Sequence, residues 1–226
     1  ARVRTILRRN RPPKRPGGHG LGIGRLHRGW WQPVKPGWLY GCGEFGAEAL
    51  DPVDLMRRRY PRDWLPGSAA EEEPWSPNAI VKSQTGRYHR MWFDTPRTLE
   101  GWVRESHRHQ AWVTRLMTEA FRRDARMNTF AIHLFIDAFP SGWMKSIMDV
   151  ERRPKAAYFA YRDALAPLAI SLRTDRTAVF AGEKVRIEAW VANDRDEMPR
   201  GLRMVTQVKL GRETIAEGEA GIGVPA

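Results

Sequence analysis

The sequence of 226 residues has almost no cysteine and no long apolar run. Its single cysteine, Cys42, excludes a disulfide framework and a cysteine-based zinc site within the chain. No apolar stretch reaches the roughly 18 residues that a membrane-spanning helix needs, so we expect no membrane partner. No apolar signal segment stands at the start, and nothing in the sequence indicates a compartment. The hydrophobic fraction of 42% is nevertheless sufficient for a folded core.

Acidic residues are missing from the first 40 positions, which contain ten Lys or Arg. Most of the formal net charge of +12 therefore lies in this Arg-, Pro- and Gly-rich segment. Such a basic arm can neutralise nucleic-acid phosphates. Its aromatic residues are not interleaved for base stacking, however, and its GxGxG run lacks the strand-to-helix context of a phosphate-binding loop. We expect residues 1–37 to be a loop that binds no nucleic acid, with its cations facing solvent, an acidic neighbouring segment or an anionic glycan.

The next part of the chain alternates between strand and helix patterns, an order typical of a parallel sheet with helical crossovers. Its second strand is nearly all apolar, which indicates burial on both faces. Residues 60–97 form a long excursion rich in Pro and Trp. A structureless segment of that length in a compact domain is usually functional or disordered. We expect the C-terminal part of a (β/α)8 TIM barrel, an α/β fold, in this part of the chain. The predicted elements are a strand at 38–43, a helix from Asp51, a helix at 98–126, a strand at 128–136 and a helix at 154–166.

The hydrophobic period changes from 3.6 to 2 after Pro167, which predicts antiparallel strands with one polar face. Three alternating runs, at 170–172, 185–191 and 204–210, indicate an all-β immunoglobulin-like sandwich. We therefore place the barrel part at 38–167, with 1–37 as its basic loop, and the sandwich at 168–226. A whole barrel needs about 250 residues and such a sandwich about 100, so we expect the chain to be a piece of a larger protein.

One carboxylate stands where an α/β barrel places its active site, at the C-terminal end of a strand. Glu44 follows the apolar run WLYGCG and is flanked by Gly43 and Gly46, which would let the backbone approach a ligand closely. A carboxylate on a rigid strand end suits nucleophilic attack or general acid/base work. A structural glutamate in a buried ion pair is the alternative.

Three stretches, in this order and spacing, resemble glycoside hydrolase family 2 over about residues 38–195: GCGEFGAEALDP, NTFAIHLFIDAFPSGWMKSIMD and RRPKAAYFAYRDALAPLAISLRTDR. The family contains retaining β-glycosidases, with the catalytic Glu at the end of the seventh barrel strand and a β-sandwich after the barrel. The resemblance implies that Glu44 is the nucleophile and forms a covalent glycosyl-enzyme. It also implies that Trp143 is an aromatic wall for the sugar ring and that Asp137 binds sugar hydroxyls. The second stretch is closer to the β-mannosidase and glucosaminidase style than to that of the β-galactosidases.

A retaining glycosidase needs a second carboxyl group as acid/base, about 5–5.5 Å from the nucleophile. Family 2 supplies it from an Asn-Glu pair far upstream, and this sequence contains no Asn-Glu dipeptide. Glu48 lies four residues past the strand end, on the chain leading away from the site. We therefore expect the chain alone to be inactive, with the upstream half of the barrel as its partner, on the same parent protein or on another chain. A non-catalytic structural or carbohydrate-binding fragment is the competing hypothesis.

Several other residues have two readings. His19 and His27 lie in the loop before the strand of Glu44 and are candidates for substrate binding. The tryptophans of the excursion either stack on sugars or pin the excursion to its own domain. His107 and His109 are two residues apart on a helix and so point to different faces, and we expect a solvated His107 and a packed His109 rather than a metal site. The mechanism demands no metal and no organic cofactor.

Overall fold

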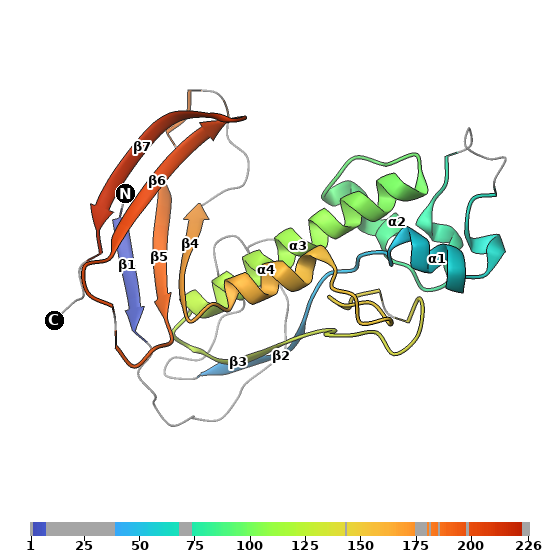
Figure 1. The fold of residues 1–226 in the computed structure, drawn as a ribbon, viewed down its shortest axis with the longest axis horizontal. Helices are drawn as coiled ribbons and strands as arrows, with labels where there is room; N and C mark the ends of the chain where they lie inside the picture. Colours follow the sequence, from blue (N-terminus) through green and yellow to red (C-terminus); the bar gives the residue numbers. More distant parts are fainter. Residues whose placement is uncertain are drawn as a thin grey trace. The chain divides into compact units, whose positions relative to one another are not determined.

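The computed structural model describes most of the chain, which folds into two compact units (Figure 1). The larger unit is Pro12–Ala166, and the smaller one combines Ala1–Arg11 with Pro167–Ala226. No helix in the described part is long and apolar enough to cross a membrane. The described residues are 2–7, 39–67, 74–142, 144–174, 180, 182–184, 186–197 and 199–222.

A parallel pair of strands, β2 (Tyr40–Phe45) and β3 (Met127–Ile132), is the sheet of the larger unit. This confirms the parallel pairing that the strand–helix–strand order predicts. The pair stays two-stranded over the described residues, and no barrel is seen there. The expectation that the second strand is buried on both faces is wrong, because several residues of β3 are exposed. β3 also ends earlier than predicted, since the following Leu134 pairs its backbone with Lys145 and Ile147 instead.

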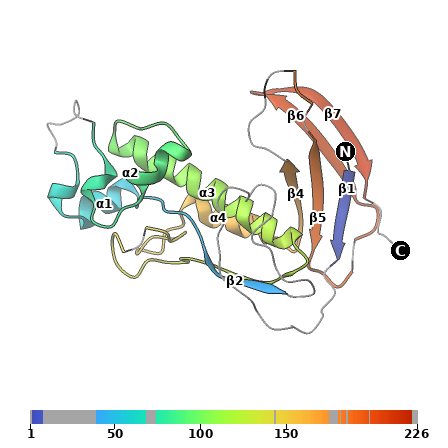
Figure 2. The ribbon, with the colours of Figure 1, turned by 180° about the vertical axis from the view of Figure 1, so that it is seen from behind.

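Two helices pack along each other beside this pair: α3 (Leu99–Arg123) and α4 (Ala156–Ala164), as both views show (Figures 1 and 2). Thr98 begins α3 as its N-cap, with its side chain accepting a hydrogen bond from the Gly101 amide at 3.1 Å. One core lies between α3 and the strands. Phe45 of β2 packs edge-on against Phe121 of α3, with ring centroids 5.0 Å apart. Burying a phenylalanine stabilises a fold by about 1.5–3 kcal/mol.

The excursion is built from short helices and packs around a second core. Leu50, Tyr60, Ile80 and Trp102 are among its buried members. α1 (Val53–Arg59) precedes the excursion, whose own elements are η2 (Arg62–Trp64), η3 (Pro77–Ala79), α2 (Thr85–Tyr88) and η4 (His89–Met91).

One indole hydrogen bond joins the excursion to α3, and a second one lies within the excursion. The Trp102 Nε1–H donates to the Trp75 carbonyl at 2.9 Å, and the Trp75 Nε1–H donates to the Trp64 carbonyl at 3.0 Å. These bonds favour the reading in which the tryptophans pin the excursion to its own domain.

A fully buried ion pair joins the start of α4 to the segment after β2. Lys155 Nζ lies 3.3 Å from Asp51 Oδ1, and their side chains are 0% and 1% exposed. Lys155 also donates to the Ala49 carbonyl at 3.2 Å, and the Tyr60 hydroxyl donates to Asp51 Oδ2 at 2.8 Å. Burial, together with the neighbouring Asp51 charge, raises the pKa of Tyr60, so this hydroxyl keeps its proton and remains a donor.

The smaller unit contains a three-stranded sheet in the order β1-β5-β4 and a separate hairpin. β1 (Arg2–Leu7) is parallel to β5 (Ile187–Asn193), and β4 (Leu168–Thr174) is antiparallel to it. The hairpin pairs β6 (Arg203–Leu210) with β7 (Glu213–Gly221).

Three of these strands were predicted, but β1 and β7 were not. The expected loop at 1–37 is therefore wrong at its first residues, where β1 pairs with a strand far away in the sequence. No two-sheet sandwich is seen in the described part of this unit, so the fold is mixed α/β with short sheets.

Candidate active site at the end of the parallel strands

The candidate nucleophile meets a histidine at the C-terminal edge of the parallel pair. Glu44 is the penultimate residue of β2, and His133 directly follows β3. The Glu44 Oε2 atom lies 3.0 Å from His133 Nε2, with the two side chains 69% and 24% exposed. The His133 amide also donates to the Phe45 carbonyl at 2.7 Å. Glu44 is thus an accessible carboxylate whose orientation is set by a neighbouring imidazole.

Gly46 allows the backbone of His133 to lie close to the end of β2. A Cβ atom at Gly46 would lie 2.3 Å from the carbonyl oxygen of His133, closer than real Cβ contacts come. From the sequence we expected Gly46 to let the backbone approach a ligand closely. In the structure it lets the backbone of His133, directly after β3, approach instead.

We expect Gly46→Ala to reduce the free energy of unfolding by about 1–3 kcal/mol, the usual cost of overpacking a tight contact. Chemical denaturation of the chain followed by circular dichroism measures this change. Gly67→Ala is the matched control, because a Cβ atom added at Gly67 would have no other atom within 4 Å. A Gly46 variant as stable as the Gly67 variant would contradict the close approach.

Of the other proposed substrate-binding residues, only Asp137 lies in the described part of the chain. Asp137 is only 4% exposed, and its carboxylate accepts a hydrogen bond from the Ser146 hydroxyl. His19, His27 and Trp143 lie outside the described residues. The sequence analysis missed His133 as a partner of Glu44, although the ends of adjacent parallel strands meet at one edge of a sheet and so place it beside Glu44.

Glu48 holds the excursion in place through hydrogen bonds. Its carboxylate accepts hydrogen bonds from the Ser83 hydroxyl at 3.0 Å, the Gln84 amide at 2.8 Å and both the amide and the hydroxyl of Thr85, at 2.8 and 2.7 Å. A carboxylate with these partners anchors the start of α2. This arrangement does not suit Glu48 as a substitute acid/base.

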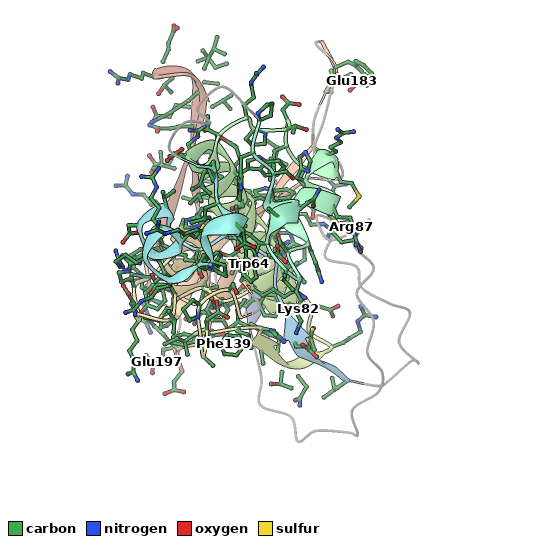
Figure 3. All side chains as sticks on the ribbon, turned by 90° about the vertical axis from the view of Figure 1, so that its right-hand side faces the viewer. Trp64, Lys82, Arg87, Phe139, Glu183 and Glu197 are labelled. Atoms are coloured by element: carbon green, nitrogen blue, oxygen red, sulfur yellow. The ribbon has the colours of Figure 1, made fainter. Side chains whose placement is uncertain are left out.

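A cavity of about 960 Å³ opens between the excursion and the segment after β3. Four of its lining residues are labelled in Figure 3: Trp64, Lys82, Arg87 and Phe139. Glu44 and His133 are not among the residues that line it. Within the described ranges, no group of three or more His, Cys, Asp or Glu could hold a metal ion.

Comparison with known proteins gives a structural likeness but no sequence family. No family model matches the chain, and no curated protein matches it either. Among solved structures, the chain resembles a β-D-mannosidase from Dictyoglomus thermophilum, with a TM-score of 0.53 and 16% sequence identity. The match covers 83% of this chain and 23% of that one. The chain therefore shares a fold with part of a glycosidase and spans less than a quarter of that protein's length.

Proposed function

We propose that this chain is the C-terminal part of the catalytic domain of a retaining β-glycosidase of the family 2 type. The observation that carries the proposal is the exposed Glu44 carboxylate at the C-terminal edge of two parallel strands, 3.0 Å from His133 Nε2. The resemblance of the GCGEFGAEALDP stretch and the likeness to part of a β-mannosidase support the same reading. We propose terminal β-linked sugars as substrates, and a β-mannoside is the first to test.

In the proposed reaction, Glu44 attacks the anomeric carbon of the sugar. A bond forms between a Glu44 carboxylate oxygen and this carbon while the bond to the leaving oxygen breaks. His133, with its proton on Nε2, donates to the other carboxylate oxygen and holds the attacking one toward the sugar. Water then displaces Glu44, which restores the original configuration at the anomeric carbon.

The leaving oxygen needs a proton from a second carboxyl group, about 5–5.5 Å from Glu44. Glu48 is occupied by residues 83–85 and does not serve. The proposal therefore includes an upstream segment that supplies this acid/base, on the same polypeptide or on a second chain. His19, His27, Asp137 and Trp143 remain proposed contacts of the sugar.

Trapping of the covalent intermediate tests the proposal. The complete protein, meaning this chain with its upstream segment, is incubated with 2,4-dinitrophenyl 2-deoxy-2-fluoro-β-D-mannoside. Its leaving group departs without an acid, and its fluorine slows hydrolysis of the intermediate. We expect peptide mass spectrometry to find one fluorosugar on the peptide that contains Glu44, and none on a Glu44→Gln variant. A label on another carboxylate, or turnover of the unfluorinated mannoside without any label on Glu44, would overturn the assignment.

A further inference from the structure

The cavity beside the excursion has the size and walls of a binding site for a small ring-bearing molecule. Its volume of about 960 Å³ falls within the range of small-molecule sites, about 300–1,000 Å³. Trp64 and Phe139 contribute aromatic surface from two different segments. Phe139 is 59% exposed, so its ring remains accessible to a ligand. Aromatic faces that remain accessible in a concave site suit the apolar face of a sugar ring.

Two segments that line the cavity are held by α3, one through Trp75 and the other directly. Trp64 packs edge-on against Tyr60, with ring centroids 5.9 Å apart, and its carbonyl accepts the Trp75 indole bond. On the opposite side, the Gln110 side-chain amide of α3 donates to the carbonyl of Lys145 at 3.2 Å. The cavity is therefore pre-formed, which lowers the cost of ordering a ligand in it.

Cations outnumber anions in the lining of this cavity. Among the described residues, Lys82, Arg87 and Lys145 line it, together with a single carboxylate, Glu48. The Glu48 oxygens are already used by the hydroxyl and amide donors of residues 83–85. Lys82 and Arg87 are both exposed, and neither forms an ion pair with a carboxylate of the described chain. Two cations beside an aromatic wall favour a ligand that combines a ring with a negative charge.

We propose that this cavity binds a sugar that carries an acidic group, a carboxylate or a sulfate. The sugar ring stacks on Phe139 and Trp64, and the acidic group is bound by Lys82 and Arg87. Glu44 does not line this cavity, and the proposal does not depend on Glu44 being a nucleophile.

Isothermal titration of the full chain with methyl β-D-glucuronide and methyl β-D-glucoside tests the proposal, because the two sugars differ only in the acidic group. We expect the glucuronide to bind about 10-fold more tightly or better, since a charge-assisted hydrogen bond is stronger than a neutral one. Glucose 6-sulfate in the same titration distinguishes a preference for sulfate from one for carboxylate. Inorganic sulfate tests whether the site takes an anion without a ring.

Matched variants assign the binding to this cavity. The double variant Lys82→Gln and Arg87→Gln should lose the preference for the glucuronide, whereas Arg90→Gln with Arg97→Gln should keep it. The control pair comes from the same excursion, is exposed and does not line the cavity. Phe139→Ala should lower the affinity for both sugars by a similar factor.

Three results would overturn the proposal. These are equal affinity for the two sugars, equal losses in the two double variants, or binding of inorganic sulfate that matches the glucuronide. Thermal unfolding of each variant, followed by circular dichroism, shows whether a loss of binding reflects the cavity or a loss of fold. A Phe139→Ala variant that retains its fold and its full affinity for the glucuronide would also count against the stacking.

Discussion

Replacement of Glu44 by Gln is expected to lower kcat of the complete protein on aryl β-glycosides by a factor on the order of 10⁴ or more. An amide cannot form the covalent glycosyl-enzyme, and loss of a nucleophile that acts as part of a unit removes most of the catalytic rate. The measurement is the initial rate of release of 4-nitrophenol from 4-nitrophenyl β-D-mannoside. Folding should be unaffected, because the Glu44 side chain is 69% exposed.

A chemical rescue sharpens this test. Glu44→Ala leaves space beside His133, and azide can occupy that space and attack the anomeric carbon itself. The product should then be a glycosyl azide with inverted configuration, because only one displacement has taken place. Glu100→Gln, an exposed glutamate that pairs with Arg57 on the surface, is the control and should retain full activity. Unchanged hydrolysis by Glu44→Gln would exclude Glu44 as the nucleophile.

Loss of the buried Lys155 ammonium should strongly destabilise the larger unit. We expect Lys155→Met to reduce the free energy of unfolding by about 3–5 kcal/mol, since removal of one partner leaves a buried charge without compensation. The charge left behind is that of Asp51, which is 1% exposed and retains only weaker polar contacts, from Tyr60 and the Ser141 amide. Urea denaturation of the chain, followed by tryptophan fluorescence, measures the change.

A second substitution distinguishes a charge effect from a packing effect. Adding Asp51→Asn to Lys155→Met removes the remaining charge and should recover part of the lost stability. Arg57→Gln breaks the exposed pair with Glu100 and should cost no more than about 1 kcal/mol. If Lys155→Met cost no more than Arg57→Gln, the buried pair would contribute little to the fold.

Local signals predicted the elements that depend on a few consecutive residues. Thr98 was the expected start of the long helix, and it is the N-cap of α3 because its side chain can satisfy the free Gly101 amide. The parallel pairing of β2 and β3 also follows from the order of strand and helix. The likeness to part of a β-mannosidase agrees with the resemblance at the level of the fold.

Contacts between distant residues could not be predicted in the same way. β1 takes its place from pairing with β5, near the other end of the chain, and its few residues carry too short a pattern to predict that. His107 was expected in solvent, yet its Nε2 atom lies 2.7 Å from the Leu50 carbonyl, and burial lowers its pKa. Its neighbour His109 was expected to be packed, and it is, with burial lowering its pKa to about 4.

The shape and the charge of the cavity depend on different residues. Hydrogen bonds from Trp102 to Trp75 and from Trp75 to Trp64 position one wall, whereas Lys82 and Arg87 supply charge. Trp64 takes its position from a helix of 25 residues, through two indole bonds that involve no charged side chain. Lys82 and Arg87 are exposed and take no part in these bonds. Substitutions at these two positions can therefore accumulate during evolution with little effect on the walls. Relatives with this scaffold can diverge in the ligands that they accept while they retain the same pocket.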